Sequence, residues 1–558
     1  MNTRSLSILI LLCTTVVILL FEWSPSWQEE IFIHSTYWFI LVLVMTFLYT
    51  ITTHKPNSTL VVKHIQKHAY ALLLLILGAI ILTTSIPFEL RVLADESNLI
   101  STSRSLFDQK VFQNSVSGKY YYDNYHSTHT AVPIRPPLFA FLLSIVHSIL
   151  GYAPENAGWL NLGFWLGLVY IIYINTYKKT TGSLALCVIP IMLSIPILSL
   201  STRSGGFDLL SVFLLVVIFH IVRIIDDKPT EQLLWILWST LLLFIHTRYE
   251  NITILAFVVP YLMYKHRIHE HRLIDIWVSA GLFFLIPKWF QMRFSSGNYE
   301  NESQALLSIS NLYTHAGSFV ESMFDTSLQL PYNNLLNILG CIGCGMILWD
   351  ILQKRIKMRN GFEILCAGFL TCIFLAHFLG DPQNQTSLRF FLIVNVTLAL
   401  TAIYTLHRLH LPTRLFLLFS VAMACIYHPI GVRNEYMNAL VYPREARVVY
   451  EVLRPMRSSN TLVLVDMPGA FVVQDVGALS IEYANLNIEE LHEEFEQRLY
   501  EQILVVQRIM HDTQQPIDED ALNDQYRLIP LVTHQTSDEY FLRISEVLDI
   551  DILTQEEN

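Results

Sequence analysis

Charged residues able to do chemistry stand beside long apolar runs. Asp95 and Glu96, in the segment ELRVLADESN, follow an apolar run that ends near residue 88. Adjacent carboxylates at such a place can take a proton from a hydroxyl group or help to hold a divalent metal ion. The alternative is that the pair is the solvated end of a helix.

An arginine stands before a rigid helix start later in the same segment. Arg135 precedes Pro136 and Pro137 in IRPPLFAFLL. Proline suits the first turn of a helix, and a planar guanidinium can bind two oxygens of a phosphate group. Arg135 is therefore a candidate phosphate ligand at the membrane surface. The alternative is an arginine that only extends its head group to the surface.

Three further segments bring charge to the ends of apolar runs: STRSGGFDLL, HTRYEN and GDPQNQTSLRFF. Charged groups near membrane depth are costly and often functional. Each of these groups could also belong to an internal ion pair. The candidate residues in these segments are Arg203, Asp208, Arg248, Glu250, Asp381 and Arg389.

The elements that must position these residues are membrane helices. Of 558 residues, 53% are hydrophobic and 15% are charged, whereas about 25% are charged in an average soluble domain. From Leu440 onward the chain holds 8 Lys and Arg against 23 Asp and Glu, a formal charge of −15, so the preceding part carries +4. The composition predicts a polytopic integral membrane protein with an acidic soluble tail. The absence of a long basic stripe argues against nucleic acid as a partner.

A membrane span needs roughly 20 apolar residues, and the pattern predicts about 13 spans. The apolar stretch 137–150 is too short, and we expect a re-entrant or interfacial helix there. Cys341 and Cys344 lie inside one predicted span, where small residues favour helix packing over a redox or metal motif. The predicted spans are 5–21, 35–53, 69–88, 158–177, 184–200, 208–225, 232–247, 250–265, 273–291, 332–352, 362–379, 388–405 and 413–431.

Lys and Arg concentrate in alternate connections between these spans, which indicates the cytoplasmic side. On that basis all the candidate residues above fall on the opposite, outer side, and so does the tail. We therefore expect two extra N-terminal helices in 1–68, a catalytic core in 69–431 with a long outer loop 88–157, and an extracytoplasmic acidic domain in 440–558. Strand-like runs at 461–466, 502–509, 527–532 and 540–545, with a helical run at 488–502, predict that this domain is a small α/β fold. The fold class is thus mainly α, a transmembrane helical bundle with a C-terminal α/β domain.

The motifs ADES, RPPL and STRSGGFD, followed by an outer hairpin, resemble in this order the GT-C superfamily of integral membrane glycosyltransferases. The similarity is greatest to the branch of protein-mannosyltransferases and lipid A aminoarabinose transferases. It rests on motifs over 69–265 and on hydropathy over 266–431. The resemblance implies a GT-C-like bundle whose sugar donor is linked to a polyprenyl phosphate. No nucleotide-binding glycine fingerprint is present in the sequence.

The resemblance also implies roles. Asp95 would deprotonate or orient the acceptor, and Glu96 would support it or a divalent metal. The sequence departs from the family at RPPL, where Lys-Pro-Pro is commoner, and at HTRYEN, where relatives often carry a Thr-Lys-Gly turn. The residues expected to hold the donor phosphate or to line its pocket are Arg135, Arg203, Asp208, Arg248, Glu250 and Arg389.

The expected function is transfer of a sugar to a glycolipid, glycan or protein acceptor in cell-envelope glycan biosynthesis, at the outer face of a bacterial inner membrane. Two other classes stay open. A membrane transporter would spread charges through the depth of its spans and often carry inverted repeats. A non-catalytic envelope scaffold would tolerate loss of Asp95, Arg135 or Arg248.

Overall fold

The computed structural model describes residues 14–15, 25–53, 65–121, 124–266, 281–296, 308–325, 331–355, 359–377, 387–410, 412–427, 432, 441–456, 460–517 and 520–551. The predicted span 5–21 lies almost wholly outside these residues, as does Asp381. The chain divides into two compact units. We call residues 1–88, 134–143 and 157–439 the helical unit, and residues 89–133, 144–156 and 440–558 the sheet unit.

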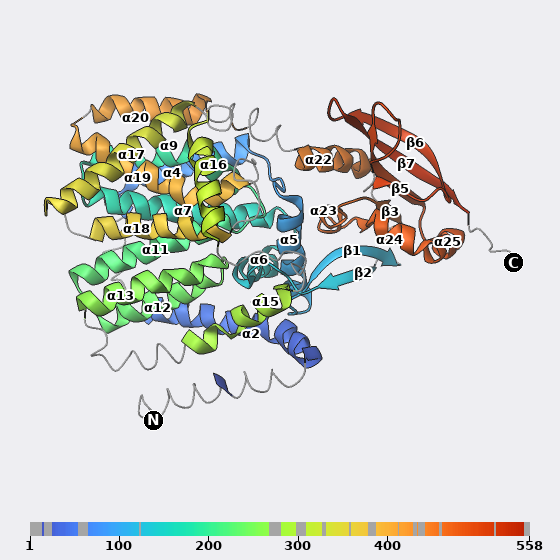
Figure 1. Cartoon of the computed structure of the whole chain (residues 1–558), viewed down its shortest axis with the longest axis horizontal. Coiled ribbons are helices and arrows are strands. Elements are labelled where there is room, and N and C mark those ends of the chain that lie inside the picture. Colours follow the sequence, from blue (N-terminus) through green and yellow to red (C-terminus); the bar gives the residue numbers. More distant parts are fainter. Residues whose placement is uncertain are drawn as a thin grey trace. The chain divides into compact units, whose positions relative to one another are not determined.

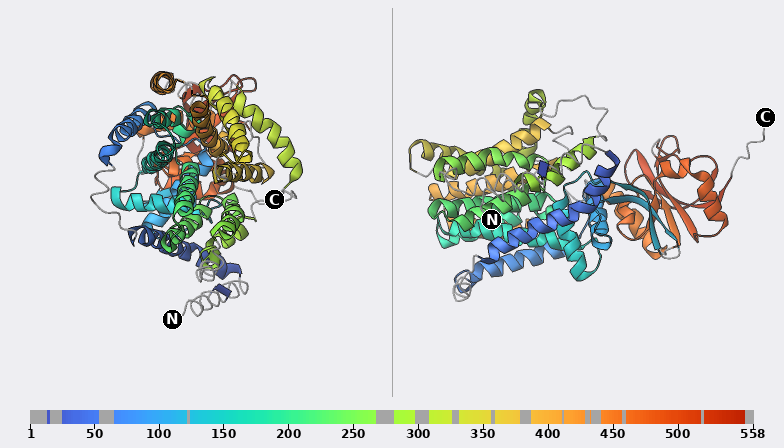
Figure 2. Two further views of the ribbon diagram at one scale, coloured as in Figure 1. Left: turned by 90° about the vertical axis from the view of Figure 1, so that its left-hand side faces the viewer. Right: turned by 90° about the horizontal axis from the view of Figure 1, so that it is seen from below.

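The helical unit is a bundle whose helices lie side by side, and the left view of Figure 2 looks almost along them (Figures 1 and 2). Among the described residues, five helices are long and apolar enough to cross a membrane. The count of 13 spans stays a prediction. The five are α2 (Pro25–Thr53), α7 (Asn156–Tyr177), α11 (Asp208–Asp227), α17 (Pro331–Leu352) and α19 (Leu392–Arg408). Shorter apolar helices include α4 (Ala69–Ser85), α12 (Glu231–Ile245), α13 (Leu255–His266), α18 (Arg359–His377) and α20 (Thr413–Ala422).

The predicted continuous span 184–200 is wrong in this form. The segment folds as three short helices, α8 (Gly182–Leu186), α9 (Val188–Leu193) and α10 (Pro196–Ser201). Pro196 opens α10, and Ile195 before it has extended backbone angles, φ −82° and ψ 109°. A proline disfavours the helical conformation of the preceding residue and starts a new helix well. The short stretch 137–150 forms one helix, α6 (Pro137–Leu150), which begins at the second proline.

Small residues let α17 and α19 pack closely. A side chain built at Gly343 would place its Cβ 2.1 Å from the carbonyl oxygen of Thr401. The Thr401 hydroxyl donates a hydrogen bond to the carbonyl of Gly340 at 2.9 Å, and Cys344 Sγ lies 3.6 Å from that hydroxyl. Cys344 therefore belongs to a packing surface, as the small-residue pattern predicted.

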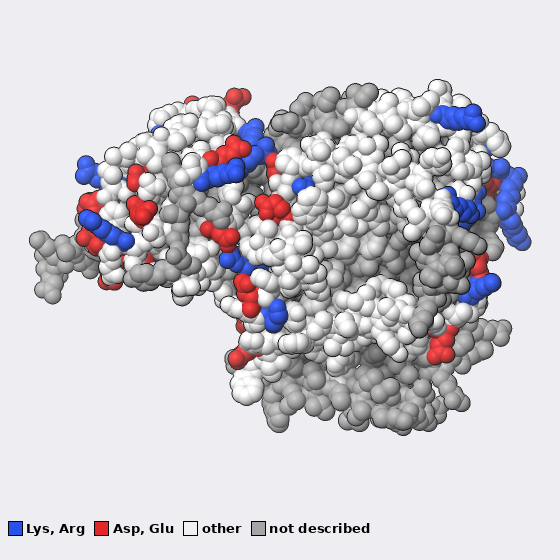
Figure 3. Space-filling model, turned by 180° about the vertical axis from the view of Figure 1, so that it is seen from behind, with Lys and Arg blue, Asp and Glu red and all other residues white. Residues whose placement is uncertain are grey.

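The outward surface of the helical unit is apolar. On α4, Leu73 is 63% exposed and Ile80 is 52% exposed, whereas Leu82 is fully buried. Figure 3 shows few charged side chains along the described surface of this unit, with Lys and Arg gathered at one end. An exposed apolar belt of this kind suits contact with lipid. The chain is an integral membrane protein.

The sheet unit contains a seven-stranded sheet in the order β2-β1-β4-β3-β5-β7-β6. The predicted tail strands are confirmed as β3 (Thr461–Leu464), β5 (Gln502–Met510), β6 (Tyr526–Gln535) and β7 (Tyr540–Ile550), with β4 (Gly477–Leu479) added. The predicted helix is α25 (Ile488–Glu496). Buried Leu462, Leu464, Ile503 and Val505 of the parallel strands form its core with Leu491 of α25.

Two strands of this sheet come from the first loop (88–157) rather than from the tail. They are β1 (Asn114–Tyr121) and β2 (Asn124–Ala131), which pair with each other in antiparallel fashion. β1 also pairs with β4, where Gly118 lies opposite Ala478. The sequence did not predict this hairpin. Its consequence is that the first loop and the tail share one sheet (Figure 1).

Candidate active site

The two carboxylates of the first loop open a helix of the sheet unit. Asp95 and Glu96 lie in the first turn of α5 (Leu93–Asp108), where the helix dipole favours negative charge. Glu96 is fully buried. Its Oε2 accepts a hydrogen bond from the backbone N–H of Arg91 at 2.9 Å, and its Oε1 lies 3.7 Å from the Arg91 guanidinium. Asp95 is half-buried. Glu96 thus fixes the turn, whereas Asp95 retains contact with the surface.

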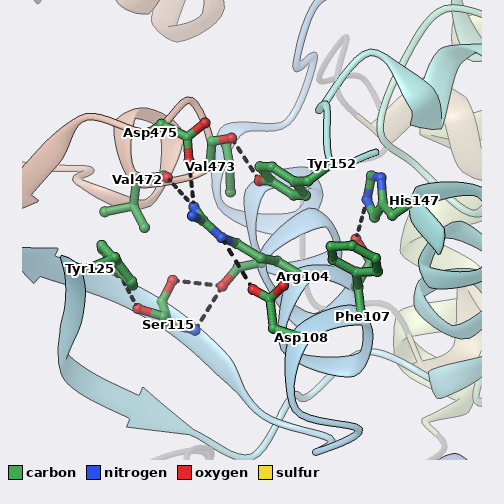
Figure 4. Close-up of polar contacts among 12 residues, drawn as sticks. Arg104, Phe107, Asp108, Ser115, Tyr125, His147, Tyr152, Val472, Val473 and Asp475 are labelled. Carbon is green, nitrogen blue, oxygen red and sulfur yellow. Dashed lines mark hydrogen bonds and ion pairs between the residues drawn. The ribbon is translucent and has the colours of Figure 1, made fainter. Parts of the chain in front are cut away.

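The opposite end of α5 is fixed by an arginine. Figure 4 shows Arg104 extending from α5 toward Asp475, with which it forms a 2.8 Å ion pair. Its guanidinium lies 4.7 Å from the ring centre of Tyr152 and 5.2 Å from that of Tyr125. The Tyr152 hydroxyl donates to the carbonyl of Val473 at 2.7 Å. Arg104 thereby joins α5 to the segment after α23 (Gly469–Val472).

Close packing also holds the beginning of α5. A Cβ added at Gly469 would lie 3.2 Å from Ser97 Oγ, so α23 approaches α5 two residues beyond Asp95. Ser101 Oγ donates to the carbonyl of Ser115 in β1 at 2.8 Å. The position of Asp95 therefore depends on the hairpin and the tail together. Sequence reasoning did not predict a role for Arg104 in this arrangement.

A cavity in the helical unit gathers four of the predicted site residues. Arg248 Nη1 donates to Asp208 Oδ1 at 2.9 Å, and its Nε donates to Glu250 Oε1 at 2.6 Å. Asp208 begins α11, Arg248 lies in the tight turn after α12, and Glu250 begins the 3₁₀ helix Glu250–Ile254. Arg389 lines the same cavity. The structure therefore brings Asp208, Arg248, Glu250 and Arg389 together around one cavity, as the sequence predicted for these four residues.

An aromatic ring lies beside both arginines of this cavity. The guanidinium carbons of Arg248 and Arg389 lie 4.8 Å and 4.7 Å from the ring centre of Phe390. Asp208 Oδ2 is buried and has no hydrogen-bond partner among the described residues. Aromatic faces stabilise guanidinium groups that are removed from water. The cavity thus holds two arginine side chains against one aromatic ring.

Lys288 adds a cation that sequence reasoning missed. It lies on α15 (Ile286–Ser296) and is 1% exposed. Its Nζ lies 4.1 Å from the ring centre of Tyr249 and interacts electrostatically with Glu250. Within the part of the chain that is described, this Nζ has no hydrogen-bond partner. The sequence feature that could have identified Lys288 is that it is a single lysine inside the predicted span 273–291.

Two other predicted arginines do not line this cavity. Arg203 is buried, and its Nε donates to the carbonyl of Ile86 at 3.3 Å while its guanidinium covers the ring of Trp159. Arg135 is half-buried, and its carbonyl accepts a hydrogen bond from Gln291 Nε2 at 2.5 Å. Their functional roles stay predictions.

The expected divalent metal site receives no support from the donor set. Across the described ranges, no three His, Cys, Asp or Glu side chains group so that they could hold a metal ion. Glu96 is occupied by Arg91. We therefore assign no chemical step to a metal, and dependence on one stays a prediction.

Comparison with known proteins gives a likeness in fold. No protein-family model matches the sequence, and no curated protein matches it. The solved structure of ArnT from Cupriavidus metallidurans bound to undecaprenyl phosphate superposes with a TM-score of 0.52 at 11% identity, over 86% of this chain and 98% of ArnT. The apo form of ArnT gives 0.51 at 12% identity over the same shares. The chain therefore has the fold of ArnT, in agreement with the GT-C-like fold expected from its sequence.

Proposed function

We propose that this protein is a glycosyltransferase that moves a sugar from a polyprenyl-phosphate-linked donor to an acceptor at the outer face of the membrane. The observation that carries the proposal is the charged cavity of the helical unit. The shared fold supports it, since ArnT was crystallised with undecaprenyl phosphate. The acceptor would be a glycolipid, a glycan or a protein.

The arginines in the cavity of the helical unit are candidates for holding a phosphate group. Arg248 and Arg389 line the cavity together with the carboxylates of Asp208 and Glu250, and Arg248 forms an ion pair with each of these acids. Phosphate oxygens would be attracted to donors already held in place by these ion pairs. Preorganised cations of this kind stabilise the charge that develops on a leaving group. The apolar bundle around them suits the polyprenyl tail.

The chemical step needs a base for the acceptor and a stabilised leaving group. In the proposed reaction, an acceptor hydroxyl oxygen forms a bond to the anomeric carbon, and its proton passes to the Asp95 carboxylate. The bond between the anomeric carbon and the phosphate oxygen breaks, and polyprenyl phosphate leaves with the electron pair. Attack opposite the leaving group inverts the anomeric centre, as the family resemblance implies.

The proposal is tested with purified protein and a polyprenyl-phosphate-linked sugar, using release of polyprenyl phosphate as the readout. Asp95→Asn should lower the rate at least 100-fold, because general-base catalysis contributes about 10²–10⁴-fold. Asp108→Asn, at the other end of α5, is the matched control and should retain activity. Near-normal turnover by Asp95→Asn would refute the assignment. A wild-type rate that required a nucleotide sugar would refute the donor class.

Placement of the active site at the outer face, in a bacterial inner membrane, rests on the distribution of Lys and Arg between the loops. A single cysteine introduced in the tail, in place of exposed Asp512, tests it in intact spheroplasts. A membrane-impermeant maleimide should label that cysteine. Labelling only after membrane permeabilisation would place the tail in the cytoplasm and contradict this orientation.

A further inference from the structure

The sheet unit contains a second cavity that the proposed chemistry does not use. It lies among α22 (Val441–Leu453), the strands β3 and β5, and the start of α5. Its walls include apolar Leu93, Val449 and Phe471. The polar side chains that line it are Tyr442, Glu445, Asp466, Gln507, Arg508 and Asp520.

Arg508 supplies the only guanidinium among the described residues of the lining, and acidic side chains already neutralise it. Arg508 Nε lies 2.8 Å from Asp520 Oδ2, and Nη2 lies 3.0 Å from Asp520 Oδ1. The same Nη2 lies 2.9 Å from Asp466 Oδ2. Arg508 is 7% exposed. Three carboxylates against one arginine give the lining a formal charge of −2, which excludes an anion as the preferred ligand.

Glu445 is the group that this network leaves incomplete. It is 7% exposed, and its Oε1 has no hydrogen-bond partner among the described residues. Its carboxyl interacts with the Tyr540 hydroxyl. Burial raises the pKa of Glu445, although Tyr540 and Arg508 act in the opposite direction. A buried acceptor without a donor is costly, and a bound donor would remove that cost.

We propose that this cavity binds a protonated primary amine on the acceptor substrate. An ammonium group supplies three N–H donors and the positive charge that the lining lacks. A metal ion is a poorer fit, since no three ligating side chains group together within the described parts of the chain. The apolar walls suit the methylene stem behind an amine. The acceptor role rests on the proposed glycosyl transfer.

The position of the cavity supports a role in holding the acceptor. Leu93 in its wall and Asp95 lie two residues apart in α5, which corresponds to about 3 Å along the helix axis. Residues two positions apart in a helix point to different sides, so an acceptor whose amine contacts Glu445 would have to pass around the start of α5 to reach the proposed base. The cavity would then select amine-bearing acceptors.

Binding is tested on the full-length protein in detergent at pH 7 by saturation-transfer NMR. The probe is ethanolamine, and ethylene glycol is its neutral counterpart. Wild-type protein should bind ethanolamine and not ethylene glycol, and Glu445→Gln should weaken binding at least tenfold. Glu451→Gln, an exposed glutamate of the same helix, should bind as the wild type does. Asp466→Asn should also weaken binding, and gel filtration must show that each variant elutes as the wild type does.

The possible results separate this inference from the proposed function. Equal binding of ethylene glycol would make the cavity a hydroxyl site, and unchanged binding by both Glu445→Gln and Asp466→Asn would place the amine elsewhere; either result overturns the inference. The acceptor role requires that ethanolamine inhibit transfer competitively with the acceptor, and a lack of competition would refute it. A wild-type protein that released no polyprenyl phosphate from the lipid-linked sugar would refute glycosyl transfer while leaving the measured amine binding intact.

Discussion

Lys119 Nζ lies 3.0 Å from Glu494 Oε1, although 375 positions separate the two residues in the sequence. Lys119 is on β1 of the first loop and is fully buried, while Glu494 is on α25 of the tail and 6% exposed. The Tyr121 hydroxyl also donates to Glu494. A single buried lysine therefore neutralises a carboxylate brought in by a distant part of the chain.

Replacing Lys119 by Met should destabilise the sheet unit. The change removes the cation and leaves Glu494 buried, and breaking such a pair costs about 3–5 kcal/mol. For a unit of this size the midpoint of thermal unfolding should fall by roughly 6 °C or more. Differential scanning fluorimetry measures it. Arg527→Met, which removes one exposed cation from β6, should leave the midpoint nearly unchanged; an equal loss there would contradict a specific role for the pair.

The pH dependence of stability should involve Glu490. Burial acts to raise its pKa, but the Lys119 ammonium and the Tyr483 hydroxyl outweigh this effect, so the pKa of Glu490 lies below its usual value. A depressed folded-state pKa gives stability that is present above the unfolded pKa, near 4.3, and is lost as the pH falls through the folded pKa. The unfolding midpoint of the sheet unit should therefore fall between pH 5 and pH 3.

The fall in the unfolding midpoint between pH 5 and pH 3 should be smaller in Glu490→Gln, because that variant has no carboxylate at position 490 to protonate. Glu489→Gln serves as the control, since Glu489 is exposed and precedes Glu490 in the same helix. Unfolding midpoints measured at pH 7, 5, 4 and 3 give the comparison. Identical pH profiles for the wild type and Glu490→Gln would show that the ion pair does not contribute to acid sensitivity.

Gly343→Ala should weaken the helical unit. The added Cβ would meet the Thr401 carbonyl at 2.1 Å, so α17 and α19 would have to separate, and overpacking of this kind costs about 1–3 kcal/mol. Gly345→Ala, two residues further along α17, meets nothing within 4 Å. Thermal inactivation in detergent should be faster for Gly343→Ala and unchanged for Gly345→Ala. Equal rates would mean that the helices can move apart at little cost.

Arg248→Lys should reduce sugar transfer although the charge is conserved. Arg248 uses two different nitrogens to hold Asp208 and Glu250, and a single ammonium cannot reproduce that planar fork. We expect a decrease of at least tenfold in kcat/KM for the donor. Arg414→Lys on α20, where the arginine is exposed, is the matched control. Unchanged kinetics in Arg248→Lys would show that only the charge at this position matters.

The sequence predicted elements whose patterns are local. The apolar runs gave most helices of the bundle, and the runs at 461–466 and 502–509 gave the central parallel strands. The break before α10 was visible as Pro196 within an apolar run, but hydropathy alone treated 184–200 as continuous. The hairpin β1-β2 was missed because its residues are polar and its partner, β4, is distant in the sequence.

The candidate site was predictable in part, because some of its residues belong to local patterns in the sequence. The distribution of Lys and Arg between alternate loops predicted that Asp208, Arg248, Glu250 and Arg389 lie on the same side of the membrane. The structure brings these four residues around one cavity. That Arg248 contacts both acids depends on how α11 and the turn after α12 pack, which no sequence spacing specifies. Lys288 was hidden inside an apolar run, and Arg104 stands in a polar stretch without any motif.

The shared sheet sets an order of events during biosynthesis. The strand β1 cannot pair with β4 or contact Glu494 of α25 until the ribosome has produced residues up to 375 positions beyond Lys119. At roughly 5–20 residues per second, this takes on the order of half a minute. Throughout that time the hairpin lacks its β4 partner and Lys119 lacks its two glutamates, so folding of the turn that carries Asp95 must follow synthesis of α25.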